Sequence, residues 1–232
     1  MAIDCIIPAR MGSTRFPGKP LVKLLGKEMI RWTMEGAIKA QCFDRVVCAT
    51  DSAEIADVVT RAGFEFVMTG PCFTGSDRVA EAAKALHSDL VVNLQGDEPL
   101  ICPDVLRQVA LELQAHPEGW VTVASPLDPA EALLKTVVKI LVKDQIALDF
   151  SREIPVADVP RWKKHQGIYA YSKESRDEFA SLPQSDTEKE RSLEQLRILG
   201  RRTIRVVDSS YLSLSVDVPS DVIAVEDALR KS

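Results

Sequence analysis

Apolar runs alternate with amphipathic stretches through the first half of the chain. Short, continuous apolar runs predict strands over residues 3–7, 45–49, 64–68 and 90–94. Between and after them, apolar residues recur with helical spacing, which predicts helices over residues 28–40, 52–62, 76–86 and 103–115. Asp51, with Glu54 three residues later, is the expected N-cap of the second helix, and Pro103 is typical of a first helical position.

The second half is less regular. We expect strands over residues 137–142, 167–171 and 203–207, and helices over residues 187–200 and 219–229. Thr187 and Glu190 have the spacing of a capping box. Residues 155–162 are expected to form a loose segment at the edge of the functional site. Since no repeat or Pro/Gly-rich linker interrupts the sequence, we expect one domain over residues 1–232.

The apolar residues of the predicted strands are mostly continuous rather than alternating, which indicates a sheet covered on both faces. With helices between the strands, this pattern predicts a Rossmann-like, doubly wound, mostly parallel sheet in three α/β/α layers. Ligands of such sheets bind at the carboxyl ends of the strands. The residues that directly follow strands are therefore the candidates for function.

Composition narrows the class of protein. The 232 residues carry a net charge of −5, which argues against non-specific nucleic-acid binding. No apolar run approaches the roughly 20 residues that span a bilayer, and the first residues lack the basic segment of a signal peptide. The five cysteines are scattered and odd in number, so we expect free thiols of a cytoplasmic protein rather than disulfides or a zinc site.

The segment P-A-R-M-G-S-T-R-F-P-G-K-P over residues 8–20 directly follows the first predicted strand. Its glycines allow close approach of the backbone to an anion, and successive amides can form an anion nest. Arg10, Arg15 and Lys19 supply the clustered positive charge that a triphosphate requires. The alternative is a solvated basic loop.

Two familiar nucleotide-binding patterns do not fit this segment. A P-loop has four residues between its glycines, whereas five separate Gly12 from Gly18, and Pro20 stands where a P-loop has Ser or Thr. The dinucleotide fingerprint G-x-G-x-x-G is absent from the sequence. These differences argue against both a P-loop NTPase and a Rossmann dehydrogenase.

Two carboxylates are candidates for metal binding. Asp97 follows the strand over residues 90–94, where a carboxylate is costly unless a cation pairs with it. Mg²⁺ suits this position because it uses few protein carboxylates and fills its other sites with phosphate oxygens and water. Asp217 lies between a short strand and a proline-started helix. The alternatives are a solvated loop for Asp97 and a helix N-cap for Asp217 or Ser220.

The segment over residues 8–20 resembles the signature of the sugar-acid cytidylyltransferases, especially the CMP-Kdo synthetases (3-deoxy-manno-octulosonate cytidylyltransferases). Further segments resemble that family in the same order along the chain: T-G-S-D-R over 74–78, F-S-R with I-P over 150–155, K-H-Q-G-I-Y over 164–169, L-E-Q-L-R over 193–197 and V-D-V-P-S-D over 216–221. Together they extend over nearly the whole sequence.

The resemblance implies a role for each matching residue. Asp97 and Asp217 would coordinate Mg²⁺, and with Lys19 they would be catalytic. The residues implied to bind the nucleotide are Pro8, Ala9, Arg10, Ser13, Arg15, Lys19, Ser76 and Gln95. Those implied to bind the sugar are Arg78, Gln95, His165, Glu194 and Gln195.

The resemblance also implies the reaction. CMP is transferred from CTP to the anomeric hydroxyl of 3-deoxy-manno-octulosonate (Kdo), pyrophosphate is released, and the product serves lipopolysaccharide biosynthesis. The implied fold is of the nucleotide-diphospho-sugar transferase type. The implied assembly is a homodimer built through the sugar-binding subregion over about residues 135–215.

The chain departs from the family pattern on the sugar side. Asp149 replaces an aromatic residue, Gln166 a leucine, and Arg191 an acidic residue. Residues 211–215 replace a more glycine-rich stretch, and the segment from 154 to 165 is short. Amino-substituted Kdo or a sialic-acid-like sugar are therefore alternative substrates. An alternative of another class is a non-catalytic nucleotide-sugar binding module.

Overall fold

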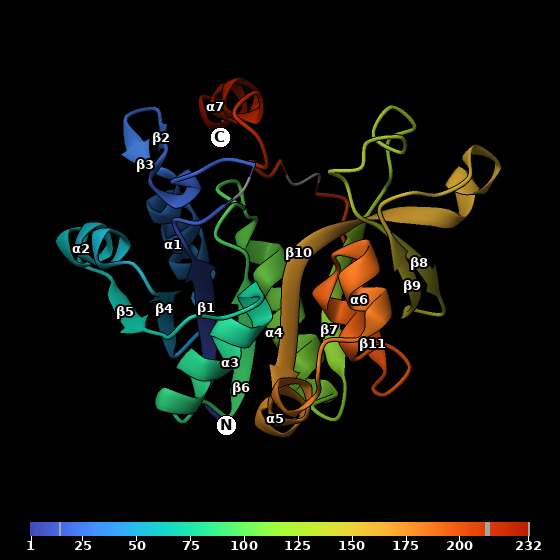
Figure 1. The fold of residues 1–232 in the computed structure, drawn as a ribbon, viewed down its shortest axis with the longest axis horizontal. Helices are drawn as coiled ribbons and strands as arrows, with labels where there is room; N and C mark the ends of the chain where they lie inside the picture. Colours follow the sequence, from blue (N-terminus) through green and yellow to red (C-terminus); the bar gives the residue numbers. More distant parts are fainter. Residues whose placement is uncertain (14, 212–213, 232) are drawn as a thin grey trace. The chain divides into compact units, whose positions relative to one another are not determined.

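The computed structural model describes residues 1–13, 15–211 and 214–231, which fall into two compact units (Figure 1). Unit 1 comprises Met1–Arg107 and Ser213–Ser232, and unit 2 comprises Gln108–Leu212. Thr14 of the basic segment and residues 212–213 of the atypical stretch lie outside the described residues. The subregion predicted to bind the sugar falls largely within unit 2, and the single-domain expectation stays a prediction.

Unit 1 contains a parallel sheet in the order β5-β4-β1-β6. Its strands are β1 (Ile3–Ala9), β4 (Arg45–Thr50), β5 (Glu65–Met68) and β6 (Leu90–Leu94). Ile6 of β1 pairs with Val47 of β4 on one side and with Asn93 of β6 on the other. Every residue of β1 and β6 is buried, as their continuous apolar pattern predicts. The predicted parallel sheet is thus confirmed for the first half of the chain.

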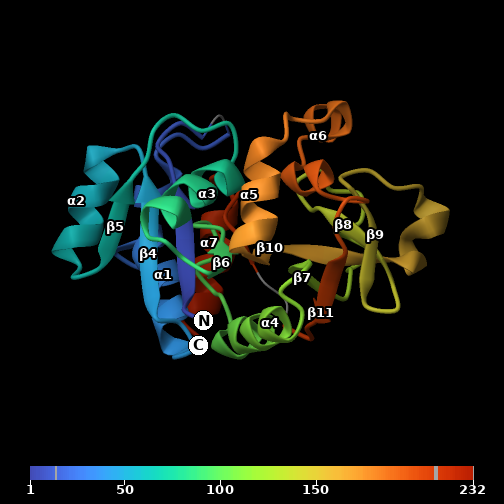
Figure 2. The ribbon, with the colours of Figure 1, turned by 90° about the horizontal axis from the view of Figure 1, so that it is seen from below.

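Helices cover both faces of this sheet. Figure 1 and Figure 2 show α1 and α3 on opposite faces. The helices are α1 (Met29–Lys39), α2 (Ala53–Arg61), α3 (Gly75–Ala85) and α7 (Asp221–Leu229), while α4 (Pro103–Ala115) contains the boundary between the units. A 3-10 turn η1 (Lys19–Leu21) and a two-stranded hairpin of β2 (Lys23–Leu24) and β3 (Lys27–Glu28) precede α1 and were not predicted.

The predicted N-cap of α2 is wrong by one residue. Ser52 caps this helix, because its side chain accepts a hydrogen bond from the Ile55 amide. The Asp51 carboxylate instead accepts a hydrogen bond from Arg78 Nη2 at 2.7 Å. Asp51 therefore forms an ion pair with Arg78 of α3 instead of the N-cap that the spacing suggested.

Unit 2 differs from the prediction of a mostly parallel sheet. Its strand order is β10-β7-β11-β9-β8, and β10 also pairs with β8. The strands are β7 (Trp120–Ser125), β8 (Lys139–Lys143), β9 (Ile146–Ser151), β10 (Trp162–Ser172) and β11 (Ile204–Asp208). Among the described pairs of this unit, only β7 with β11 is parallel.

A tight turn explains the antiparallel pairing of β8 with β9. Asp144 and Gln145, both with positive φ, join β8 directly to β9, and such a turn permits only a hairpin. β7 and β9 themselves were not predicted. The core of the unit is aromatic: the Trp120 ring lies 6.0 Å from Tyr169, 4.4 Å from Tyr171 and 5.2 Å from Phe179, measured between ring centroids.

The predicted helix over residues 187–200 is interrupted. It is replaced by α6 (Asp186–Arg191) and the 3-10 turn η3 (Glu194–Arg197), separated by Ser192 at φ 53°. The capping box of α6 is formed by Ser185 and Glu188 rather than by Thr187 and Glu190. Two further elements of unit 2 are α5 (Lys173–Ser181) and η2 (Val156–Arg161), the latter within the segment expected to be loose.

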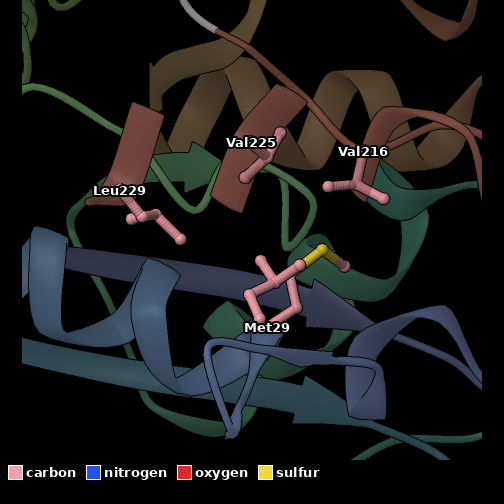
Figure 3. Close-up of a cluster of buried hydrophobic side chains, with 5 residues drawn as sticks. Met29, Val216, Val225 and Leu229 are labelled. Atoms are coloured by element: carbon pink, nitrogen blue, oxygen red, sulfur yellow. The ribbon is translucent and has the colours of Figure 1, made fainter. Parts of the chain in front are cut away.

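The final helix begins at Asp221, two residues later than predicted. Its Val225 and Leu229 pack with Met29 and Val216 in one buried cluster (Figure 3). This packing fixes Val216, and with it the neighbouring Asp217, against the start of α1.

None of the helices in the described ranges has the length and hydropathy needed to cross a bilayer. The five cysteines are free, and Cys5 and Cys48 among them are buried. Burial raises the pKa of the Cys48 thiol to about 12.

Candidate active site

A pocket of about 240 Å³ lies at the carboxyl ends of β1 and β6, within unit 1. Most residues predicted to bind nucleotide or metal line it. The lining residues are Pro8, Ala9, Arg10, Ser13, Arg15, Lys19, Pro20, Met29, Thr74, Gly75, Arg78, Gln95, Gly96, Asp97 and Asp217. The position agrees with the general rule for ligand sites of open α/β sheets.

The basic segment folds back on itself at the pocket. The amides of Ser13 and Gly18 both donate to the Met11 carbonyl oxygen, each at 3.0 Å. Gly18 has φ 71°, a left-handed conformation that glycine adopts without strain. The chain then enters η1 at Lys19, which directs the lysine toward the two acidic residues of the pocket.

Asp97 and Asp217 converge on one cation although 120 residues separate them in the sequence. Lys19 Nζ donates to the Asp97 carboxylate and lies 3.9 Å from Asp217 Oδ1. Arg15 Nη2 lies 2.9 Å from the same Asp217 oxygen. The side chains of Asp97 and Asp217 are 25% and 20% exposed, so both carboxylates remain open to the pocket.

Backbone contacts place Asp217 at the pocket. The Val216 amide donates to the Asp97 carbonyl oxygen at 3.0 Å. The Asp221 carboxylate accepts hydrogen bonds from the amides of Asp217 and Val218, at 2.8 and 2.9 Å. Asp221 thereby holds the backbone that precedes α7, and in the part of the chain described Ser220, the N-cap residue, makes no side-chain cap. The Asp217 side chain lines the pocket.

Gly96 allows β1 and the Asp97 loop to approach closely. A β-carbon at this position would lie 2.9 Å from the Pro8 carbonyl oxygen. The Gly96 carbonyl itself accepts a hydrogen bond from the Thr33 hydroxyl at 3.2 Å. A side chain at position 96 therefore has no room without moving Pro8 or Asp97, which both line the pocket.

We expect Gly96→Ala to lower the free energy of unfolding by about 1–3 kcal/mol, the usual cost of overpacking. Urea denaturation followed by circular dichroism measures this change. Gly70→Ala is the matched control, because its β-carbon would meet Glu81 at 3.7 Å, an ordinary contact distance. Equal losses in the two variants would contradict the assigned role of Gly96.

The pair of carboxylates suits a hard divalent cation. Within the described ranges no group of three or more His, Cys, Asp or Glu side chains is arranged to hold a metal. Two carboxylates around one positive centre, beside a basic loop, match the way Mg²⁺ binds with few protein ligands and several phosphate or water oxygens. Asp97 and Asp217 are thus the residues that fit this ion.

Two predicted ligands are engaged elsewhere. Ser76 is fully buried, accepts a hydrogen bond from Asn93 Nδ2 at 2.9 Å, and is absent from the described lining of the pocket. Arg78 reaches the pocket, but it is 2% exposed, and its guanidinium binds Asp51 and Thr69. The structure thus places Ser76 outside the described lining of the pocket and Arg78 within it, and the ligand role of each residue stays a prediction.

The remaining predicted ligands behave differently. Gln95 lines the pocket and donates to Asn93 Oδ1 at 3.2 Å. Its side chain also packs against Gly75, where a β-carbon would lie 3.1 Å from Gln95 Oε1. His165, Glu194 and Gln195 belong to unit 2 and form the candidate sugar side by themselves.

His165 is buried and neutral. The Thr122 hydroxyl donates its single hydrogen to the Ile168 carbonyl oxygen at 2.8 Å, so it accepts from His165 Nε2 at 2.9 Å. The proton of His165 is therefore on Nε2, and Nδ1 is an acceptor. Burial and then the charge of Arg152 lower the pKa of His165 to about 3, which makes it a poor general base near neutral pH.

This buried histidine predicts acid sensitivity. Because its pKa is lowered in the folded protein, only the unfolded chain takes up this proton between pH 6.5 and about pH 3, so stability falls as pH falls. At up to about 1.4 kcal/mol per unit, the loss between pH 6.5 and about pH 4.5 is roughly 2 kcal/mol, because the unfolded chain is already half protonated at pH 6.5. Urea denaturation at the two pH values should show this loss in the wild type and its absence in His165→Gln. Equal losses in both proteins would refute the assignment.

Tyr169 is a residue that the sequence placed in a motif without assigning a role. Its ring centroid lies 5.4 Å from that of His165. Burial, and secondly the charge of Glu194, raise the pKa of its hydroxyl, so Glu194 lies near this ring. Arg152 acts on both His165 and Tyr169. A positive group, Arg152, and a negative group, Glu194, therefore lie near the buried His165–Tyr169 pair.

Gln195 contributes an unsatisfied donor. It is 1% exposed, and its Nε2 has no hydrogen-bond partner within the described part of the chain. Arg197 holds the turn in place, because its guanidinium binds both carboxylate oxygens of the buried Glu188, at 2.9 and 2.6 Å. A buried amide without a partner is costly, which is typical of a group that meets a ligand.

Comparisons with known proteins show the family of the chain. A profile of the family described as Cytidylyltransferase matches residues 5–204. The 3-deoxy-manno-octulosonate cytidylyltransferase of Anaeromyxobacter sp. (strain Fw109-5) is 43% identical over 234 residues, covering 95% of this chain and 93% of the relative.

Two solved structures extend the comparison. CMP:2-keto-3-deoxy-manno-octonic acid synthetase complexed with CTP has a TM-score of 0.91 and 34% identity, covering 100% of this chain and 99% of that one. Apo-UDP-glucose pyrophosphorylase, with a TM-score of 0.74 and 15% identity, covers 100% of this chain and 99% of that one, and it shows the shared fold alone. The chain thus has an α/β fold of the nucleotide-diphospho-sugar transferase type.

Proposed function

The chain belongs to the 3-deoxy-manno-octulosonate cytidylyltransferases and transfers CMP from CTP to Kdo, and we propose that the pocket of unit 1 binds CTP while residues of unit 2 bind the sugar. The observation that carries this assignment is the convergence of Asp97 and Asp217 on Lys19 beside the basic segment. Intact residues at these three positions argue against a non-catalytic binding module.

In this proposal the basic segment holds the triphosphate. Arg10 is exposed at the pocket, and Ser13, Arg15 and Lys19 line it from the same segment. Pro8 and Ala9, at the end of β1, lie beneath the base. Gln95 faces the same pocket from the loop after β6 and is available to the nucleotide or the sugar.

The reaction forms a bond between the anomeric oxygen of Kdo and the α-phosphorus of CTP, and the bond to the departing pyrophosphate breaks. Asp97 and Asp217 would hold Mg²⁺, which when bound supplies charge neutralisation and orients the phosphate oxygens. Lys19 and Arg15 stabilise the charge that develops on the pyrophosphate, because preorganised cations act most strongly on the transition state.

The sugar side is assigned to His165, Glu194 and Gln195, with Tyr169 beside them. Neutral His165 offers Nδ1 as an acceptor for a sugar hydroxyl, since Nε2 donates to Thr122. Gln195 Nε2 offers a donor that has no partner in the described part of the protein. A hydroxyl or carboxylate oxygen of the sugar would accept a hydrogen bond from Gln195 Nε2.

A panel of sugars tests the proposed function. The purified protein is incubated with CTP, Mg²⁺ and either Kdo, 8-amino-Kdo or a sialic acid, and pyrophosphate release is measured. We expect the highest kcat/KM with Kdo, and loss of turnover when EDTA removes the divalent cation. A preference for another sugar would replace Kdo as the substrate. Nucleotide binding without pyrophosphate release would support the binding module.

We further propose a homodimer formed through unit 2. Large apolar side chains are exposed on this unit at Leu133, Leu134, Leu148 and Val156, with exposed fractions of 69%, 50%, 49% and 70%. Exposed apolar side chains favour association, because association removes them from water. Light scattering after size-exclusion chromatography should give twice the mass of one chain, and Leu133→Glu with Val156→Glu should reduce it to one. A monomeric wild type would rule the dimer out.

A further inference from the structure

Two residues that depart from the family pattern contact each other, although 42 positions separate them. Arg191 Nη1 lies 2.8 Å from Asp149 Oδ1. Asp149 belongs to β9 and Arg191 is the last residue of α6. Both side chains are 37% exposed, and an ion pair at such a site contributes little to stability on its own. The ion pair therefore matters for where it holds neighbouring groups rather than for the stability it adds.

The pair holds both backbone groups of Phe150. Arg191 Nη1 also donates to the Phe150 carbonyl oxygen, at 2.9 Å. The Asp149 carboxylate accepts a hydrogen bond from the Phe150 amide at 2.8 Å. Asp149 Oδ1 thus accepts from both Arg191 and the Phe150 amide, while Arg191 also binds the Phe150 carbonyl oxygen. Phe150 cannot shift along β9 without breaking these contacts.

Phe150 in turn supports His165. Its side chain is fully buried, and its ring meets the His165 ring edge-on, with centroids 5.2 Å apart and an interplanar angle of 90°. On its other side His165 is fixed by the hydrogen bond to Thr122. The position of the histidine ring is therefore set partly by Phe150.

The other end of the contact leads to the Glu194–Gln195 turn. Directly after Arg191, Ser192 adopts φ 53° and turns the chain into η3, which carries Glu194 and Gln195. Arg152, the residue directly after β9, reinforces this connection, because its Nη2 donates to the Ser192 carbonyl oxygen at 3.4 Å. Arg191 at the end of α6 thus reaches to β9, and Arg152 after β9 reaches to the residue that follows α6.

We infer that the Asp149–Arg191 pair is a positioning device that fixes the spacing between His165 and the Glu194–Gln195 turn, and so determines how tightly the sugar binds. The inference rests on the proposed function, since it takes these residues as the sugar side. Neither Asp149 nor Arg191 needs to touch the sugar.

Kinetics of matched variants test the inference. Arg191→Met removes the Nη1 donor of both hydrogen bonds, and Asp149→Ala removes the carboxylate that accepts from Arg191 and from the Phe150 amide. We expect the KM for Kdo to rise about tenfold in each, while the KM for CTP stays within about twofold, because a misplaced binding group affects only its own substrate. Arg191→Lys, which keeps the charge and a donor, should fall between these variants and the wild type.

Lys189→Met is the control, since it removes the 4.0 Å ion pair with Asp186 that stays within the same helix. We expect both of its KM values to match the wild type. The inference is overturned if the KM for Kdo is unchanged in Arg191→Met and Asp149→Ala, or if the KM values for Kdo and CTP rise equally in them. It is also overturned if Lys189→Met raises the KM for Kdo as much as these two variants do. Should Arg191→Met fail to fold, Asp149→Ala carries the comparison.

Hydrogen exchange gives a readout independent of catalysis. In Arg191→Met, peptides over residues 146–152 and 193–197 should exchange faster than in the wild type, and in Lys189→Met they should not. Unchanged exchange in Arg191→Met would overturn the inference. A wild type that releases no pyrophosphate with any sugar would refute the proposed function instead, and exchange alone would then decide whether the pair fixes this geometry.

Discussion

Asp97→Asn is expected to lower kcat by about a thousandfold or more while the protein remains folded. The substitution keeps the shape of the side chain and an oxygen that can accept from Lys19, so the local structure is preserved. It removes one of the two negative charges that face the pocket around Lys19. A divalent cation held by only two protein carboxylates loses half of its protein charge in this variant, and the metal-dependent step should fail.

Pyrophosphate release at saturating CTP and Kdo measures the effect, and thermal unfolding verifies the fold. Raising the Mg²⁺ concentration should restore part of the activity if the lesion is in metal binding. Asp57→Asn is the matched control, because Asp57 forms an exposed ion pair with Arg61 on α2, outside the residues that line the pocket. Near-normal turnover of Asp97→Asn would remove Asp97 from the metal site.

Much of unit 1 could be predicted because its signals are local. A strand buried on both faces is predominantly apolar, and β1 and β6 show this in the sequence, with Asp4 and Asn93 as their polar members. The basic segment and Asp97 both follow such strands, so their meeting at one sheet edge follows from parallel pairing. Asp217 differs, because it reaches the pocket through α7 packing on Met29, a contact that no local pattern encodes.

The second half resisted prediction for the same reason. The break at Ser192 depends on Glu188 binding Arg197 across the turn, and a buried ion pair leaves no periodic trace in the sequence. Arg78 binds Asp51 and Thr69, and no local pattern in the sequence indicates these contacts. Asp149 and Arg191 lie 42 positions apart, and no local pattern in the sequence predicts that their side chains meet.

Lys19→Met is expected to raise the KM for CTP about a hundredfold and to leave the KM for Kdo within about twofold. Lys19 is the cation shared by Asp97 and Asp217, and it lies in the basic segment at the start of η1. Its removal takes one positive charge from the triphosphate and leaves two carboxylates facing each other without their common partner. Both effects oppose the approach of a polyanion, whereas the sugar ligands of unit 2 are unchanged.

Initial rates with each substrate varied in turn separate the two KM values. Lys23→Met is the matched control, since Lys23 is an exposed lysine four residues further along and does not line the pocket. Lys19→Arg tests whether charge alone suffices, and we expect it to recover only part of the CTP affinity, because a guanidinium is wider than the ammonium that fits between the two carboxylates. Equal increases in both KM values would place Lys19 outside the phosphate site and would point to a general distortion of unit 1.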